Sequence, residues 1–160
     1  MTARRPILLV DIDGVLNPWG IEVCPDGYCE YELFADDDEP VRLAAVHGEW
    51  LRELSDVFDL AWASAWGFQA HKLLGPILDL PEFPFVPMPP IRFAPEDKVP
   101  AVAEYVGDRP AAWIDDMIGE AACRWAESSR VPTLLMQIDH KRGLTRPTVD
   151  QLLSWARRFS

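Results

Sequence analysis

Two aspartates separated by one residue, Asp11 and Asp13, follow an apolar run and precede Gly14. In an extended backbone, residues at this spacing project to the same side, and the glycine lets the chain turn sharply afterwards. Two carboxylates placed together can divide covalent and acid–base work between them. One attacks as a nucleophile, while the other gives a proton to a leaving oxygen and later takes one from water.

Four further polar residues follow or flank other apolar runs: Ser64, Lys98, Asp115 and Asp116. Four carboxylates packed together repel one another, so a divalent cation is their natural neutraliser, and oxygen-only ligands favour Mg²⁺ over zinc. A lysine, a serine hydroxyl and Mg²⁺ together can position and neutralise the three oxygens of a phosphoryl group. Phosphoryl transfer needs little more than this, so the six residues predict that chemistry.

The elements that must position these residues are predicted from the apolar pattern. Continuous apolar runs predict strands at 7–10, 60–63, 111–114 and 133–138. A weaker, peripheral strand is predicted at 83–88, where prolines cannot donate to a central ladder. Apolar residues at spacings of three and four predict helices at 41–58, 67–78, 96–106, 119–128 and 148–159, the second broken near Gly75 and Pro76.

Strands that alternate with helices of this length predict an α/β fold, a three-layer α/β/α sandwich on a mainly parallel, Rossmann-like sheet. In such a sheet, ligands bind beyond the carboxyl ends of the strands, which is where five of the six candidate residues stand. Lys98 stands instead in the first turn of the predicted helix 96–106, where the helix dipole disfavours a cation. The segment 21–34 alternates on both sides of Pro25-Asp26-Gly27, which predicts a short β-hairpin after the first strand. With the acidic run 36–39, it forms a predicted flap, residues 18–40.

Two aromatic and two sulfur-bearing residues lie near the predicted site. Trp19 and Trp66 each follow a candidate residue closely, so they are candidates to stack on a base or aryl group of a substrate, or simply to pack at the pocket rim. Cys24 and Cys29 bracket the predicted hairpin turn, where a disulfide or a metal clip is conceivable, and we expect free thiols.

Composition limits the class of protein. A chain of 160 residues that is 49% hydrophobic predicts one globular domain over residues 1–160. Its formal net charge of −11 argues against generic DNA or RNA binding, which uses positive charge. The apolar runs are too short for a membrane span, and no apolar leader follows the first arginines. Three cysteines fit a reducing compartment. A cytoplasmic protein is therefore expected.

The motifs resemble those of the haloacid dehalogenase (HAD) superfamily of phosphohydrolases. The run ILLVDIDGVLNP resembles their first motif, a hydrophobic strand followed by DxDGV, and LAWAS, ending in Ser64, resembles the second. Lys98 in EDKVPAVAEY resembles the third, and AAWIDDM, with Asp115 and Asp116, the fourth. All four occur in order, and the resemblance extends from about Ile7 to the last predicted helix.

The resemblance implies roles for these residues. Asp11 would be the nucleophile that becomes a phosphoaspartate, and Asp13 the general acid/base. Mg²⁺ would be held by the Asp11 carboxylate, the backbone carbonyl of Asp13 and the acids at Asp115 and Asp116. Which of the last two binds Mg²⁺ directly is left open. Ser64 and Lys98 would hold the phosphoryl group, and the acid at position 13 argues against dehalogenation.

The short insertion before Ser64 implies a nearly capless member, and such members often act on bulky or macromolecular phosphates. The segments WASAW and HKRGLT resemble a small HAD group found with RNA-repair proteins, and polynucleotide end phosphatases share its DxDGT and DD motifs. This chain departs from that pattern with serine instead of threonine in the second motif and with an acidic composition.

The leading hypothesis is therefore a Mg²⁺-dependent phosphatase that hydrolyses a phosphomonoester through an aspartyl phosphate. One alternative is a polynucleotide end phosphatase or phosphotransferase in nucleic-acid repair. Another is a non-catalytic HAD-like module with a binding or regulatory role. The expected partner is a phosphorylated small molecule or nucleic-acid end and not a membrane. An oligomer in which a neighbour covers the site is left open.

Overall fold

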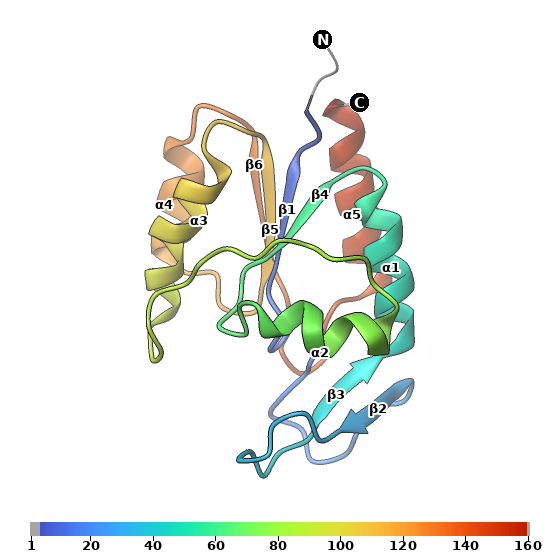
Figure 1. Ribbon diagram of the computed structural model, residues 1–160. Coiled ribbons are helices and arrows are strands. Elements are labelled where there is room, and N and C mark those ends of the chain that lie inside the picture. Colours follow the sequence, from blue (N-terminus) through green and yellow to red (C-terminus); the bar gives the residue numbers. More distant parts are fainter. Residues whose placement is uncertain (1–3, 160) are drawn as a thin grey trace.

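The computed structural model describes residues 4–159, and its centre is a four-stranded parallel sheet (Figure 1). The strands are β1 (Ile7–Val10), β4 (Asp59–Trp62), β5 (Ala111–Asp115) and β6 (Thr133–Gln137), in the order β4-β1-β5-β6. Strand β1 pairs with both β4 and β5, so that Leu8 lies opposite Leu60 and Ala112. All of its residues are buried, as the continuous apolar run predicts. The predicted α/β class and the mainly parallel sheet are confirmed.

Helices cover both faces of this sheet (Figure 1). They are α1 (Ala45–Ser55), α2 (Gln69–Leu78), α3 (Lys98–Val106), α4 (Glu120–Ser128) and α5 (Arg146–Ala156). Leu8 and Val10 of β1 belong to one hydrophobic cluster with residues of α1, α2 and α5. Ile7 and Leu9 belong to a second cluster with residues of α3 and α4. Alternate side chains of the strand therefore fill two cores, which fixes the carboxyl end of β1 between them.

Short 3₁₀ turns adjoin two of the helices, η1 (Pro95–Asp97) before α3 and η2 (Arg157–Phe159) after α5. The longest helices, α1 and α5, have 11 residues each, against the ~20 apolar residues that a membrane span needs. Among the described residues, no helix is both long enough and apolar enough to cross a membrane.

The hairpin differs from its predicted form. A turn does form, because the backbone N–H of Tyr28 donates to the carbonyl of Pro25, but residues 21–24 form no strand. Instead β2 (Tyr28–Tyr31) pairs antiparallel with β3 (Val41–Ala44), directly after the flap. The predicted helix 41–58 is therefore wrong in its first four residues. Val41 and Leu43 are buried while Arg42 between them is less so, an alternation that the helical spacing of Leu43 with later residues concealed.

Two predictions about proline also need correction. Helix α2 continues through Pro76, because Leu74 and Leu78 on either side of it pack in the core. The predicted strand 83–88 is reduced to one isolated bridge between Trp62 and Phe85. Prolines on both sides of Phe85 remove the backbone donors that a longer ladder would use.

Candidate functional site

Few polar side chains are buried in this fold, and most of those few are together. In the part of the chain described, the buried polar or charged residues are Asp11, His47, Ser64, Lys98 and Asp115. All except His47 lie at the carboxyl ends of β1, β4 and β5 or at the start of α3. Burying a charge is costly unless it is paired, so these groups must compensate one another.

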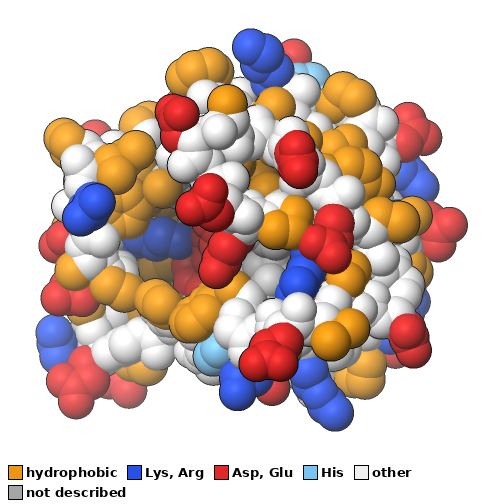
Figure 2. Space-filling view, turned by 90° about the horizontal axis from the view of Figure 1, so that it is seen from below, with side chains coloured by type: hydrophobic (Ala, Val, Ile, Leu, Met, Phe, Trp, Pro, Cys, Tyr) orange, Lys and Arg blue, Asp and Glu red, His pale blue; other side chains and the backbone are white. Residues whose placement is uncertain are grey.

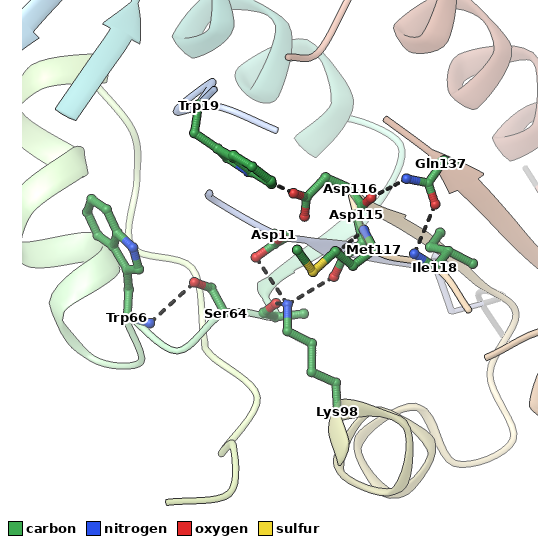
Figure 3. Close-up of polar contacts among 11 residues, drawn as sticks. Asp11, Trp19, Ser64, Trp66, Lys98, Asp115, Asp116, Met117, Ile118 and Gln137 are labelled. Atoms are coloured by element: carbon green, nitrogen blue, oxygen red, sulfur yellow. Dashed lines mark hydrogen bonds and ion pairs between the residues drawn. The ribbon is translucent and has the colours of Figure 1, made fainter. Parts of the chain in front are cut away.

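Lys98 provides that compensation. It begins α3, and its Nζ donates to Asp11 Oδ1 at 3.1 Å, to Asp115 Oδ2 at 2.9 Å and to the Ala63 carbonyl at 2.9 Å (Figure 3). Burial alone would lower the pKa of the Lys98 ammonium, but the charges of Asp11 and Asp115 outweigh it and raise the pKa. The lysine therefore stays charged and joins the ends of three neighbouring strands.

Three carboxylates form a compact cluster, and two of them, Asp11 and Asp115, contact this ammonium. Asp11, Asp115 and Asp116 each offer an oxygen within 4.8 Å of the others. Burial raises the pKa of Asp11 well above its ordinary value, and the charge of Asp115 raises it further, while Lys98 acts in the opposite direction. Burial also raises the pKa of Asp116. When ionised, these three carboxylates exceed the single ammonium of Lys98 in charge, and an oxygen-liganded divalent cation such as Mg²⁺ would neutralise the excess.

Asp13 lies outside that cluster and is exposed. Its Oδ1 accepts the side-chain amide of Asn17 at 2.9 Å, and its Oδ2 accepts the indole N–H of Trp66 at 3.1 Å. Both oxygens are therefore oriented by neighbours, while the carboxylate still borders the same hollow as Asp11. The role of the Asp13 backbone carbonyl as a metal ligand stays a prediction.

The two tryptophans act as hydrogen-bond donors to acids of the site. Trp19 donates its indole N–H to Asp116 Oδ2 at 3.0 Å, as Trp66 does to Asp13 (Figure 3 draws the first of these). Trp66 is only 8% exposed, so little of its ring is free for a substrate, whereas Trp19 is 39% exposed. Stacking on a substrate stays a prediction. The two indole hydrogen bonds were not predicted, because they depend on how the segments meet in space.

Ser64 follows β4, and its hydroxyl oxygen accepts the backbone N–H of Trp66 at 3.3 Å. Its own hydrogen can therefore be donated to a phosphoryl oxygen. All six candidate residues line one hollow of about 480 Å³: Asp11, Asp13, Ser64, Lys98, Asp115 and Asp116. The structure thus brings together every residue that the sequence proposed for the chemistry, from segments up to 105 residues apart between Asp11 and Asp116.

Two amide side chains in this region were missed by the sequence analysis. Asn17 orients Asp13 and also accepts the backbone N–H of Arg42 at 2.9 Å, which ties the first motif to β3. Gln137 donates to the carbonyl of Asp116 and accepts the N–H of Ile118, so it fixes the turn after β5. The position of Asn17 within the first motif was a usable signal. Gln137 offered none, because its contact requires β5 and β6 to be neighbours.

Gly14 is expected to be indispensable for the position of Asp116. Its φ of +85° favours glycine, and a Cβ built on it would lie 2.2 Å from Asp116 Oδ2. We expect Gly14→Ala to lower the free energy of unfolding by roughly 1–2 kcal/mol through backbone strain and, in addition, to weaken Mg²⁺ binding more than tenfold by displacing Asp116. Chemical unfolding and calorimetric Mg²⁺ titration measure the two effects.

Gly27→Ala is the matched control for this prediction. Gly27 has the same φ of +85°, but no atom lies within 4 Å of the position of its Cβ. Gly27→Ala therefore introduces the same backbone strain but displaces none of the aspartates of the site. Equal Mg²⁺ affinities of the two variants would contradict the proposed link between Gly14 and Asp116.

Comparison with known proteins adds no relative to this description. No protein-family model, curated protein or solved structure matches the chain. The chemistry of the site therefore has to be argued from its own residues and their geometry.

Proposed function

We propose that this protein is a Mg²⁺-dependent phosphatase that hydrolyses a phosphomonoester through an aspartyl phosphate on Asp11, and that its fold is the three-layer α/β/α sandwich of the HAD phosphohydrolases. The observation that carries the proposal is the contact of one buried ammonium, on Lys98, with both Asp11 and Asp115. Asp13 and Ser64 border the same hollow. A nucleophile, an acid/base and two phosphoryl-binding groups thus face one space, as phosphoryl transfer requires.

In the first step, a carboxylate oxygen of Asp11 attacks the phosphorus of the substrate and the bond from phosphorus to the leaving oxygen breaks. Asp13, in its protonated form, gives that oxygen its proton, so the leaving group departs as a neutral alcohol. Asn17 and Trp66 keep the Asp13 carboxyl aimed at the hollow through this exchange. Asp11 then carries the phosphoryl group as an acyl phosphate.

In the second step, water attacks the same phosphorus. Asp13, now a carboxylate, takes a proton from this water, and the bond between phosphorus and the Asp11 oxygen breaks. Inorganic phosphate leaves, Asp11 is again a free carboxylate and Asp13 is again protonated, so no other reactant is consumed. One residue therefore serves as acid in the first step and as base in the second.

Charge stabilisation comes from Lys98, from Ser64 and from a bound cation. The positive charge of the Lys98 ammonium attracts the phosphoryl oxygens, and the Ser64 hydroxyl donates to one of them. The carboxylates of Asp11, Asp115 and Asp116 would hold Mg²⁺, which neutralises negative charge on the phosphoryl group when it is bound. Asp13 separates this proposal from a purely metal-binding module, because its side chain is outside the three-carboxylate cluster and such a module has no use for it.

Phosphate release tests this proposal. The panel contains an aryl phosphate, sugar phosphates, mononucleotides and oligonucleotides phosphorylated at either end, each measured with Mg²⁺ and with a chelator. We expect release from at least one compound with Mg²⁺, its loss with the chelator and its recovery when Mg²⁺ is restored. Mg²⁺ binding shown by calorimetry, without release from any compound, would contradict the proposal and favour a non-catalytic module.

A further inference from the structure

A second, larger hollow continues from the one that holds the candidate residues. It has a volume of about 1060 Å³ and shares Asp13, Trp19, Ala65 and Ile91 with the smaller hollow as lining residues. We call it the flap groove, because residues of the flap and of the following β3 form much of its wall. Figure 2 views the molecule from the side of the flap and shows a hollow with hydrophobic side chains on its rim and charged side chains within it. A phosphomonoester bound near Asp11 therefore has room for its leaving group in the flap groove.

Aromatic and aliphatic surface lies where the two hollows join. One face of the Trp19 ring is stacked on His140, with ring centroids 3.7 Å apart and planes at 17°. His140 lines neither hollow, so the part of Trp19 that borders them is turned away from His140. Ile91, which is 79% exposed, is the other large apolar side chain at this junction. Such a surface suits a flat ring that stacks on Trp19.

The charge of the flap groove is strongly negative beyond this junction. Besides Asp13, its wall contains the acidic side chains of Glu22, Asp37 and Glu39. Arg42 is the one basic residue among the described residues that line it, and its terminal nitrogens donate to the carbonyls of residues 21 and 22 at 3.0 and 3.2 Å. A leaving group with further phosphates would be repelled here, whereas an uncharged or positively charged one would not.

We propose that the flap groove holds the leaving group of the substrate, and that this leaving group is a flat ring system that is uncharged or positively charged. The substrate is then a small heteroaromatic or aromatic monophosphate, not the phosphorylated end of a nucleic-acid strand. This inference rests on the proposed phosphatase function. Trp19 contributes twice, with its indole N–H to Asp116 and with its free ring surface to the leaving group.

Alkyl phosphates test the inference, and butyl phosphate and 2-phenylethyl phosphate form the matched pair, because their leaving alcohols have similar acidities. With Mg²⁺, kcat/KM is compared for butyl phosphate, 2-phenylethyl phosphate, 2-(pyridinium-1-yl)ethyl phosphate and a 5′-phosphorylated oligonucleotide. We expect the two ring compounds to exceed butyl phosphate about tenfold, and the oligonucleotide to be the poorest substrate. Equal values for ring and butyl compounds, or an oligonucleotide that exceeds them all, would overturn the inference and leave the phosphatase function standing.

Two variants separate the ring and charge effects. In Trp19→Leu, the ratio of kcat/KM for 2-phenylethyl phosphate to kcat/KM for butyl phosphate should be within about twofold of one. This holds whatever the loss of the hydrogen bond to Asp116 does to the overall rate. The double variant Glu22→Gln with Glu39→Gln should raise the ratio of kcat/KM for the oligonucleotide to kcat/KM for butyl phosphate several-fold. Glu32→Gln, at an exposed glutamate that does not line the flap groove, is the control. An unchanged ratio in Trp19→Leu would contradict stacking on this ring.

A binding measurement distinguishes failure of this inference from failure of the proposed function. The indole N–H signal of Trp19, assigned with Trp19→Leu, is followed by NMR during titration with 2-phenylethyl phosphate and with butyl phosphate. Suppose that no compound is hydrolysed, but 2-phenylethyl phosphate binds about tenfold more tightly than butyl phosphate and shifts this signal. The phosphatase function is then contradicted, whereas binding of a ring in the flap groove is supported. If neither hydrolysis nor a ring preference in binding is found, both are overturned.

Discussion

Replacement of Asp11 by asparagine is expected to lower phosphate release to less than about 10⁻⁴ of the wild-type rate, the scale on which loss of a covalent nucleophile acts. Asparagine has nearly the same shape and keeps an oxygen that can accept from Lys98 Nζ, which donates to Asp11 at 3.1 Å. It cannot form the acyl phosphate, because a neutral amide is a poor nucleophile. The effect should therefore fall on kcat and not on the fold.

The stability of this variant provides its internal check. Burial and the charge of Asp115 both raise the pKa of Asp11, so the ionised carboxylate is held at some cost in the folded state. Removing that charge should leave the free energy of unfolding in the absence of metal unchanged or higher. Asp26→Asn, at an exposed aspartate before β2, controls for the loss of one negative charge. Substantial turnover by folded Asp11→Asn would exclude the aspartyl-phosphate route.

The parts of the fold that could be predicted are those whose sequence pattern has one physical explanation. The run Ile7–Val10 is apolar at every position because both faces of β1 are covered, and only a central parallel strand combines this with so short a length. Residues 41–44 were ambiguous, because Leu43 satisfies both the helical spacing and the strand alternation. Their pairing with Tyr28–Tyr31 makes them a strand and not a helix, and such a contact between distant segments leaves no local sequence pattern.

Some residues of the candidate site could likewise be predicted from the sequence, and others could not. Asp11, Ser64 and Asp115 could be identified because each stands at or next to the carboxyl end of a strand, where a parallel sheet collects its ligands. Lys98 stood out as a cation in the first turn of a helix, where the helix dipole disfavours it. The neighbours that orient these groups could not be identified, since Trp19 and Asp116 are 97 residues apart and meet only in the folded chain.

Replacement of Lys98 by methionine is expected to impair both stability and turnover, because Lys98 compensates two buried acids. Methionine preserves the length of the side chain and removes the ammonium, so Asp11 and Asp115 lose their shared partner. In the absence of Mg²⁺ the free energy of unfolding should fall by about 3–5 kcal/mol, the usual effect of removing one partner of a buried ion pair. Phosphate release should fall roughly 10²- to 10³-fold, since a positive charge beside the phosphoryl oxygens is lost.

Mg²⁺ should restore more stability to Lys98→Met than to the wild type, and this difference identifies the role of the lysine in the cluster. In the wild-type protein, Lys98 already neutralises part of the charge of Asp11 and Asp115, so a bound cation has less repulsion left to relieve. In the variant, the cation faces the uncompensated carboxylates of the same 4.8 Å cluster and stabilises the folded state by mass action. Thermal unfolding across a Mg²⁺ series measures the difference, with Lys72→Met, at an exposed lysine of α2, as the control. Identical Mg²⁺-induced shifts in all three proteins would mean that Lys98 and the cation do not share the same acids.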